Sequence, residues 1–276
     1  MPKPVTVHRV KHWMVRDRVT IVVVGCGGTG AALVSGLPYL HHALLAAGHP
    51  SGIRVCVIDG DRITETNCVR QPFTLSEVGL YKAQALVNRL NIFWGLDWSA
   101  IPTDVRCGRD VPDCDFLISC VDTRAARATL AKVTRLKTRK FHYWLDTGNN
   151  ADSGQFIMGE PIRPGRKDRS TRLPCIDELF PQMTRASMDR RDTLPACSAA
   201  EALVRQEPYI NQSIAQLVLA MLARLFRHGQ ISYHGGFVNL STGRVSPLPI
   251  DRLAWARLRA TAKTTTLIDQ ARISHK

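Results

Sequence analysis

Apolar residues along this chain fall into runs of two kinds. Short runs rich in Val, Ile and Leu have no polar face, which is typical of strands buried on both sides of a parallel sheet. Longer apolar or periodic segments lie between them and are typical of helices, so the alternation predicts an α/β fold with a doubly wound, mostly parallel Rossmann-like sheet. The expected strands are residues 21–24, 53–61, 115–122, 141–148 and 154–160, and the expected helices are residues 31–48, 76–93 and 124–137.

The pattern changes after residue 160. Pro, Arg, Asp and Ser dominate residues 161–208 with little periodicity, and so long an irregular stretch is more often functional than passive. Regular structure resumes with an apolar helix from Tyr209 to His228, which Gly229 ends as a C-cap, and two short strands follow it. We therefore expect a core in residues 1–160, an irregular crossover in 161–208, and a C-terminal part in 209–276 that completes the same domain.

Composition is that of a soluble globular protein. The 276 residues are 45% hydrophobic, which is enough to bury a sizeable core. No apolar stretch approaches the roughly 20 residues that cross a bilayer, and the first residues lack the apolar block of a secretory signal. We therefore expect a cytoplasmic protein with no membrane partner.

Eight cysteines are scattered along the sequence, and no pair has the Cys-x-x-Cys spacing of a zinc knuckle. In a reducing compartment such residues are most often small buried hydrophobes. We therefore expect no structural zinc.

Basic residues exceed acidic ones, which gives a formal net charge of +14. The excess is concentrated in residues 124–139, 163–172 and 185–191, and such clusters attract polyanions or an acidic protein. A solvated basic face explains them equally well. The sequence has no helix-turn-helix or zinc-finger pattern, so any binding of nucleic acid is expected to be non-specific.

A glycine-rich turn joins the first expected strand to the first expected helix. Its sequence, GCGGTG, places Gly25, Gly27, Gly28 and Gly30 where backbone N–H groups and a helix N-terminus face an anion. The same spacing occurs in proteins that bind NAD, FAD or ATP, and also in tight turns without a ligand. Asp59 ends the next strand, where a carboxylate accepts hydrogen bonds from ribose hydroxyls, so NAD remains an alternative at this point.

Polar residues that follow this strand favour a triphosphate. Two cations, Arg70 and Lys82, exceed what the pyrophosphate of a dinucleotide needs, because backbone amides serve most of that group. Asp122 ends another expected strand and offers oxygen ligands to the Mg²⁺ that accompanies a triphosphate. These residues point to ATP. The polar residues expected on the side of the glycine turn are Asn67, Arg70, Gln71 and Lys82.

The same residues form a family pattern. The chain resembles the ThiF, MoeB and ubiquitin-activating adenylyltransferases, whose motifs occur here in the same order as GCGGTG, DGD, NCVRQ, VGLYK and CVD. Arg127 also fits the pattern, although Thr123 replaces the usual Asn of that motif. Weaker similarity continues to about residue 250, and within the family the chain looks most like the ThiF-type branch of the plasmid-borne PRTRC gene cassette.

This resemblance implies that the chain activates the C-terminal carboxylate of a small ubiquitin-like or sulfur-carrier protein of the β-grasp class. That carboxylate attacks the α-phosphorus of ATP, releases pyrophosphate and forms an acyl adenylate. The resemblance also implies a homodimer, with Arg70, Lys82 and Asp122 as catalytic residues and Mg²⁺ held by Asp122. It assigns the nucleotide to Gly25, Gly27, Gly28, Gly30, Asp59, Asp61, Asn67, Arg70, Gln71, Lys82 and Asp122.

The resemblance further implies that the adenylate can pass to a cysteine in the crossover. Cys197 lies just before the apolar C-terminal helix, where the family places its Thr-Cys-x-x-x-Gly cysteine, and it is the preferred nucleophile. Cys175 is an alternative within PCIDELFP, which resembles Pro-Cys-x-x-Cys-Leu-Phe-Pro, but Glu178 replaces the second cysteine. Adenylation without a protein thioester is a third outcome.

Two other functions compete with this hypothesis. An NAD-dependent oxidoreductase would use the glycine turn and Asp59, but it would not need the cations that follow. A nucleotide-binding interaction protein, associated with nucleic acid and without adenylation activity, would explain the net charge of +14 and the missing zinc ligands. The intact Asp-x-Asp and Asn-x-x-Arg-Gln motifs favour the enzyme.

Overall fold

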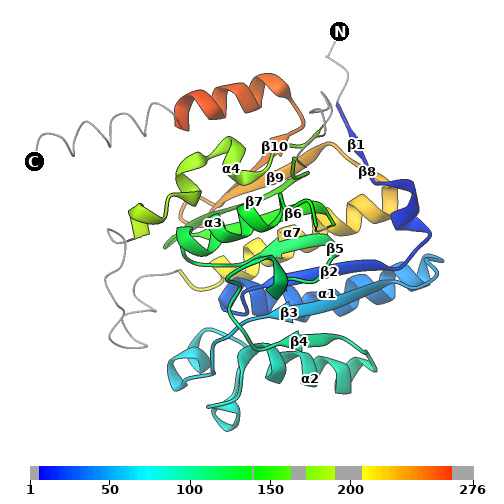
Figure 1. The fold of residues 1–276 in the computed structure, drawn as a ribbon, viewed down its shortest axis with the longest axis vertical. Coiled ribbons are helices and arrows are strands. Elements are labelled where there is room, and N and C mark those ends of the chain that lie inside the picture. The colour runs from blue at the N-terminus through cyan, green and yellow to red at the C-terminus, as the bar shows by residue number, and fades with distance from the viewer. Residues whose placement is uncertain (1–5, 139, 163–171, 190–206, 263–276) are drawn as a thin grey trace, which may run out of the picture.

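An eight-stranded sheet with strand order β10-β9-β7-β6-β5-β2-β3-β4 runs through the protein (Figure 1). The computed structural model describes residues 6–138, 140–162, 172–189 and 207–262. Helices cover both faces of the sheet. The predicted fold class, α/β with a mostly parallel central sheet, is therefore confirmed.

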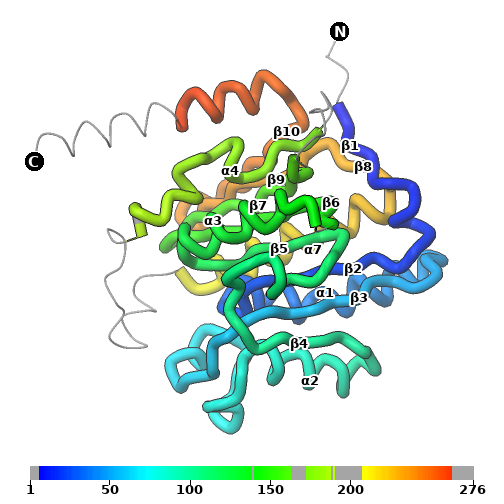
Figure 2. Tube along the Cα trace, viewed as in Figure 1, coloured from blue at the N-terminus to red at the C-terminus, as the bar shows by residue number. Residues whose placement is uncertain are grey.

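Five strands form the parallel half of the sheet. They are β2 (Val19–Val24), β3 (Ile53–Ile58), β4 (Ser99–Ile101), β5 (Cys114–Ser119) and β6 (Phe141–Asn149). The chain passes from β2 to β3 and β4 on one side, and then crosses to β5 and β6 on the other side of β2 (Figure 2). The apolar runs of β2, β3 and β5 are mostly buried, as expected for strands covered on both faces.

Three antiparallel strands extend the sheet beyond β6. β7 (Ser153–Gly159) pairs with β6 in a hairpin, β9 (Tyr233–Asn239) pairs with β7, and β10 (Arg244–Pro249) forms the edge. A separate two-stranded sheet joins β1 (His8–Arg9) to β8 (Gln230–Ile231). Strands of two residues are too short to show a hydrophobic pattern, so the sequence does not predict this pair.

Long helices cover one face of the sheet. α1 (Gly28–Ala46) contacts both α2 (Lys82–Trp94) and α7 (Ile210–His228). Because α7 packs beside it, α1 is apolar over more of its surface than a helix that faces solvent. The other face carries α3 (Arg124–Val133) and the short α4 (Ile176–Leu179) (Figure 1).

The sequence pattern predicts one helix boundary correctly and another wrongly. Gly229 ends α7 in the left-handed conformation, with a φ of 66°, which confirms the predicted C-cap. The helix predicted for residues 76–93 begins only at Lys82, so its predicted start is wrong. Ser76 lies instead in a separate 3₁₀ turn, and Gly79, with a φ of 90°, separates this turn from α2 because left-handed backbone cannot continue a helix.

Short turns and a terminal helix complete the described structure. The crossover, predicted to be irregular, contains α4 and two 3₁₀ turns in its described part. None of the described helices is both long and apolar enough to cross a bilayer. Residues 252–262 form a helix, and the 3₁₀ turns are η1 (His12–Val15), η2 (Glu65–Val69), η3 (Leu75–Glu77), η4 (Gly108–Asp110), η5 (Pro181–Thr184) and η6 (Ala186–Met188).

A buried histidine lies in the antiparallel half of the sheet. The His234 side chain on β9 is fully buried, its Nδ1 lies 2.7 Å from the carbonyl oxygen of Met158, and its ring packs edge-on against Trp255. Burial lowers the pKa of His234 to about 4, and the hydrogen bond to Met158 opposes this shift. The imidazole is therefore neutral in the folded protein at neutral and mildly acidic pH.

We predict that His234 makes the stability of the protein depend on pH. Between about pH 6.5 and pH 4 the unfolded chain binds a proton at this imidazole and the folded chain does not, so the free energy of unfolding falls as the pH falls. From pH 7 to pH 5 the wild type should lose about 2 kcal/mol more than a His234→Gln variant. Urea unfolding of both proteins at both pH values measures the difference, and equal losses would contradict the prediction.

Candidate active site

The position of the candidate site follows from the path of the chain around β2. β3 lies on one side of β2 and β5 on the other, so the carboxyl end of β2 opens between the loops that follow its two neighbours. The Gly25 N–H donates to the Ile58 carbonyl oxygen at 2.9 Å, and the Cys120 N–H donates to the Val24 carbonyl oxygen at 2.8 Å. In open α/β sheets, ligands bind in the crevice at the point where the chain connections go to opposite sides of a strand, as they do at β2.

Two glycines are required by the packing of the turn between β2 and α1. Gly25 has a φ of 95°, and a Cβ on it would lie 2.5 Å from the carbonyl oxygen of Cys120. A Cβ on Gly30 would overlap the carbonyl oxygen of Gly25. Both contacts are made by backbone, which cannot move aside as a side chain can. A larger residue at either position therefore forces the strand and the helix apart.

Gly27 has a different environment. It is the N-cap of α1, and a Cβ on it would meet nothing within 4 Å. No described side chain caps the helix and its first turn has no acidic residue, so the first N–H groups of α1 are open to an anionic ligand. Gly28, in contrast, lies against the side chain of Asn211. The space over Gly27 fits a phosphate group of a nucleotide.

Asp59 holds the glycine turn from the neighbouring strand. It lies just after β3, because the strand predicted for residues 53–61 ends at Ile58. Its Oδ2 accepts the Cys26 N–H, and its Oδ1 accepts the Asp61 N–H at 2.8 Å. Burial raises the pKa of the Asp59 carboxyl, and these two hydrogen bonds oppose the rise. Since each carboxylate oxygen accepts more than one hydrogen bond, Asp59 can hold the turn and a ribose hydroxyl together.

Lys82 is a buried cation at the start of α2. Its side chain is 8% exposed, and its Nζ lies 2.7 Å from Oδ2 of Asp61, whose own side chain is 69% exposed. The Lys82 N–H also donates to the Asp61 carbonyl oxygen at 3.0 Å, so the two ends of the segment from Asp61 to Lys82 are held together. A cation whose partner is so exposed can exchange that carboxylate for a phosphate oxygen.

Asn67, Arg70 and Gln71 lie in and just after the 3₁₀ turn η2. The Asn67 Oδ1 accepts the Thr64 N–H at 3.0 Å, and the Gln71 N–H donates to the Asn67 carbonyl oxygen at 2.9 Å. Gln71 Oε1 is buried with no hydrogen-bond partner among the described residues, whereas Arg70 is exposed. The turn therefore brings together three residues that the sequence assigns to the nucleotide.

Asp122 follows β5 and is exposed. Within the described ranges of the chain, its carboxylate has no hydrogen-bond or ion-pair partner, in contrast to the carboxylates of Asp59 and Asp61. Mg²⁺ binds to proteins through one or two such carboxylates and keeps several of its waters. The environment of Asp122 therefore fits a metal ion that arrives together with phosphates.

A buried ion pair supports the loop that carries Asp122. Arg127 on α3 is 3% exposed and Asp146 on β6 is fully buried, and the Arg127 Nε lies 2.8 Å and 3.0 Å from the two carboxylate oxygens. The Arg127 Nη2 donates to the carbonyl oxygens of Val121 at 3.0 Å and Thr147 at 3.1 Å. Burial raises the pKa of the Asp146 carboxyl, and the guanidinium opposes that rise. The network fixes the backbone next to Asp122 and, among the described residues, leaves its carboxylate unpaired.

Sequence patterns do not identify two of the supporting residues. Asp146 lies in a strand that the pattern predicts only as a buried run, although a single acidic residue among apolar neighbours indicates a buried cationic partner. Asn211 is buried in the first turn of α7, and its Oδ1 accepts the Thr29 hydroxyl at 2.8 Å. No local signal marks Asn211, because the residues that it contacts lie near the other end of the chain.

The two candidate nucleophiles differ in what the structure says of them. Cys197 lies outside the described residues, so its place relative to the site stays a prediction. Cys175 is fully buried, and burial raises the pKa of its thiol well above the ordinary value, which disfavours the reactive thiolate. Glu178, at the position of the second cysteine in the family motif, accepts hydrogen bonds from Arg172 through both carboxylate oxygens. Cys175 therefore fits a structural role.

Comparison with known proteins gives a family and a set of similar folds. The sequence model of the ThiF family matches residues 15–259. None of the curated proteins matches the chain significantly. Among solved structures, that of PaaA shares 16% identity and has a TM-score of 0.54, over 84% of this chain and 64% of PaaA.

MccB of E. coli has a similar relation to the chain. Its structure with MccA shares 19% identity and has a TM-score of 0.55, and its structure with ATP shares 18% identity and has a TM-score of 0.53. Both comparisons cover 85% of this chain and 64% of MccB. The chain therefore spans less than two thirds of the length of these proteins, and the likeness shows a shared fold.

We predict that alanine at two glycines of the turn separates folding from ligand binding. The methyl group of Gly30→Ala has to displace the backbone of Gly25, so the free energy of unfolding in urea should fall by about 2 kcal/mol or more. Gly27→Ala has room for its methyl group and a φ of −76°, so its stability should stay within about 1 kcal/mol of the wild type.

The methyl group of Gly27→Ala fills the space over the N-terminus of α1. Calorimetric titration with Mg·ATP should therefore show binding about tenfold or more weaker than in the wild type. If a folded Gly27→Ala variant binds ATP as tightly as the wild type, then no phosphate lies over this helix N-terminus.

Proposed function

Because the chain belongs to the ThiF family, we propose that it uses ATP to adenylate the C-terminal carboxylate of a peptide or small protein. The observation that carries the proposal is the open N-terminus of α1 at Gly27, in the crevice between the loops that follow β3 and β5. The first residue of α2, after the loop that follows β3, is the buried cation Lys82, and the loop after β5 carries the carboxylate of Asp122, which has no partner among the described residues. A helix N-terminus, a lysine and a carboxylate are the groups that bind a nucleoside triphosphate with its Mg²⁺.

The proposed reaction is a displacement at the α-phosphorus of ATP. A carboxylate oxygen of the acyl substrate forms a bond to that phosphorus, and the bond from the phosphorus to the oxygen that bridges to the β-phosphate breaks. Pyrophosphate leaves with the electron pair, and the acyl group remains joined to AMP. Because the attacking carboxylate is already ionised, no general base is needed, and catalysis rests on positioning and electrostatics.

The residues of the site have separate tasks in this scheme. Asp59 binds the ribose, and Asn67 and Arg70 bind phosphate oxygens. Lys82 exchanges Asp61 for a phosphate oxygen and so offsets the charge that develops on the leaving pyrophosphate. Mg²⁺, when bound at Asp122, supplies further charge neutralisation across the phosphates.

The acyl substrate in this proposal is a ubiquitin-like or sulfur-carrier protein of the β-grasp class. A polypeptide substrate is supported by MccB, of which one solved structure holds ATP and another holds MccA. The β-grasp partner, the PRTRC branch, the homodimer and a thioester on Cys197 rest on the sequence resemblance. The division of the chain into a core, a crossover and a C-terminal part belongs to the same proposal.

ATP–pyrophosphate exchange tests the proposal, because it reports reversible adenylate formation whatever step follows. The probes are a pool of short synthetic peptides with free C-terminal carboxylates and a candidate β-grasp protein. The control is the same peptide pool with C-terminal amides. We expect exchange with the acids and none with the amides. Absence of exchange with both probes would contradict the proposed activity.

We predict that Asp122→Asn lowers the exchange rate by about 100-fold or more, because a neutral amide holds Mg²⁺ weakly. Its free energy of unfolding in urea should stay within about 0.5 kcal/mol of the wild type, since the carboxylate is exposed. Asp17→Asn is the matched control: Asp17 is also exposed but lies before β2, at the end of the strand opposite the site. If Asp122→Asn exchanged pyrophosphate at the wild-type rate, Asp122 would have no role in the proposed reaction.

A further inference from the structure

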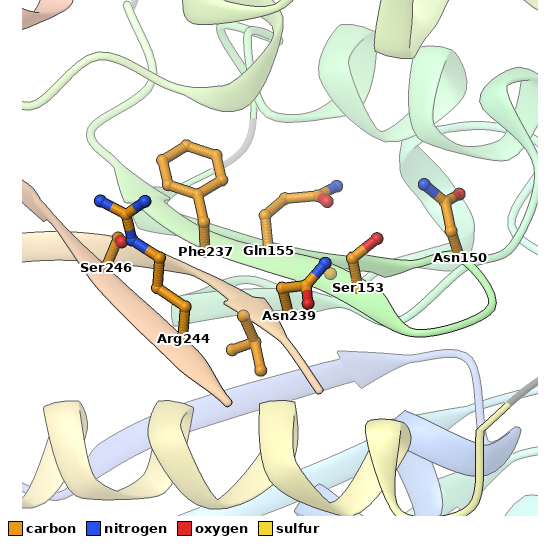
Figure 3. Close-up of a pocket in the computed structure, with 9 residues that line it drawn as sticks. Asn150, Ser153, Gln155, Phe237, Asn239, Arg244 and Ser246 are labelled. Carbon is orange, nitrogen blue, oxygen red and sulfur yellow. The ribbon is translucent and has the colours of Figure 1, made fainter. Parts of the chain in front are cut away.

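A polar groove crosses the antiparallel part of the sheet. Its volume is about 280 Å³, and side chains from β7, β9 and β10 project into it on the side away from α7 (Figure 3). Its lining is made mostly of amides and hydroxyls, with one aromatic ring and one cation. The residues that define this polar groove are Ser153, Gln155, Phe237, Asn239, Arg244 and Ser246.

Strand register explains why these side chains share one face. Gln155 on β7 is opposite Phe237 on β9, which is in turn opposite Ser246 on β10. One step further along, Ser153 is opposite Asn239, which is opposite Arg244. Alternate residues of a strand point to the same face, so the two rows of side chains form one continuous surface across three strands.

Gln155 is the residue of the polar groove that lies nearest to the candidate active site. A Cβ on Gly148 would lie 2.6 Å from the Gln155 Nε2 and 3.3 Å from the Arg127 Nη2. The same Arg127 nitrogen donates to the carbonyl oxygen of Val121, the residue before Asp122. Gln155 therefore lies beside the buried network that supports the loop of Asp122, and it is the part of the groove nearest to that loop.

The far end of the polar groove favours a carboxylate. Arg244 is exposed and is the only charged residue among the described residues that line the groove, and no acidic residue in the described ranges forms an ion pair with it. The neighbouring Asn239 Oδ1 already accepts the Thr242 N–H at 2.8 Å, so its amide nitrogen remains to donate. One guanidinium beside one amide donor suits a single carboxylate, whereas a polyanion needs several cations.

We propose that the polar groove binds the residues that precede the reacting carboxylate of the acyl substrate, and that Arg244 selects an acidic side chain among them. The inference rests on the proposed adenylation. Arg244 on β10 is two strands away from Gln155 on β7 and two residues further along the strand direction. With about 4.8 Å between strands and about 3.3 Å per residue, the two residues are roughly 12 Å apart. An extended peptide advances about 3.3 Å per residue, so about four residues span this distance, and Arg244 reaches a side chain about four or more residues before the carboxylate.

The test uses synthetic peptides with a free C-terminal carboxylate and a fluorescent label at the other end. One Asp is moved through the positions of a neutral sequence, and each peptide is paired with its Asn counterpart. Fluorescence polarisation at low ionic strength, without ATP, should show about three- to tenfold tighter binding of the Asp peptide at one position in the expected window. This preference should vanish in Arg244→Gln, while the neutral peptides bind both proteins equally.

Arg54→Gln is the matched control, because Arg54 is exposed at the amino end of β3, away from the polar groove, and should leave the preference unchanged. Equal binding of Asp and Asn peptides, an unchanged preference in Arg244→Gln, or no measurable peptide binding would overturn the inference. ATP–pyrophosphate exchange on the same peptides separates the two proposals. Exchange without an Asp preference would support the proposed adenylation and contradict the role of the groove. An Arg244-dependent preference without exchange would support peptide binding in the groove and contradict the adenylation.

Discussion

The buried guanidinium of Arg127 is the interaction on which the candidate site depends. It joins the start of α3 to the carboxyl ends of β5 and β6 through Asp146 and the carbonyl oxygens of Val121 and Thr147. The Ser119 hydroxyl adds a further hydrogen bond to Asp146 at 2.6 Å, so the buried charges are well solvated by the protein. Removal of one partner from such a pair typically costs about 3–5 kcal/mol, because the other charge is left buried and unpaired.

Around this support, the polar groups of the site divide into those with structural partners and those without. Asp59 holds the glycine turn, and Lys82 is paired with Asp61. The N-terminus of α1 at Gly27 and the carboxylate of Asp122 have no such partner among the described residues. A nucleotide would therefore enter a site whose backbone is already fixed, and only Lys82 would have to change its partner. Such preorganisation is what electrostatic catalysis of a displacement at phosphorus requires.

The antiparallel strands of the sheet add a polar surface beside the proposed nucleotide site. β6 contributes Asp146 to the support of the site, and two residues later its Gly148 lies against Gln155 of the polar groove. The parallel half thus presents the crevice for a nucleotide, and the antiparallel half presents a polar surface next to it. In the proposed activity, ATP and the acyl substrate approach Asp122 from these two halves, so the carboxylate and the α-phosphorus meet where the halves join.

The sequence by itself determined most of the longer strands and helices and the order of the motifs. Buried apolar runs identified the central strands, and GCGGTG between strand and helix identified the turn, because these features depend on neighbouring residues. Only the tertiary structure decided which polar groups meet. Asp146 pairs with Arg127 from a different element, and Asn211 reaches Thr29 from 182 residues away. Such contacts leave no local pattern, since strand order and helix packing, rather than spacing along the chain, bring the partners together.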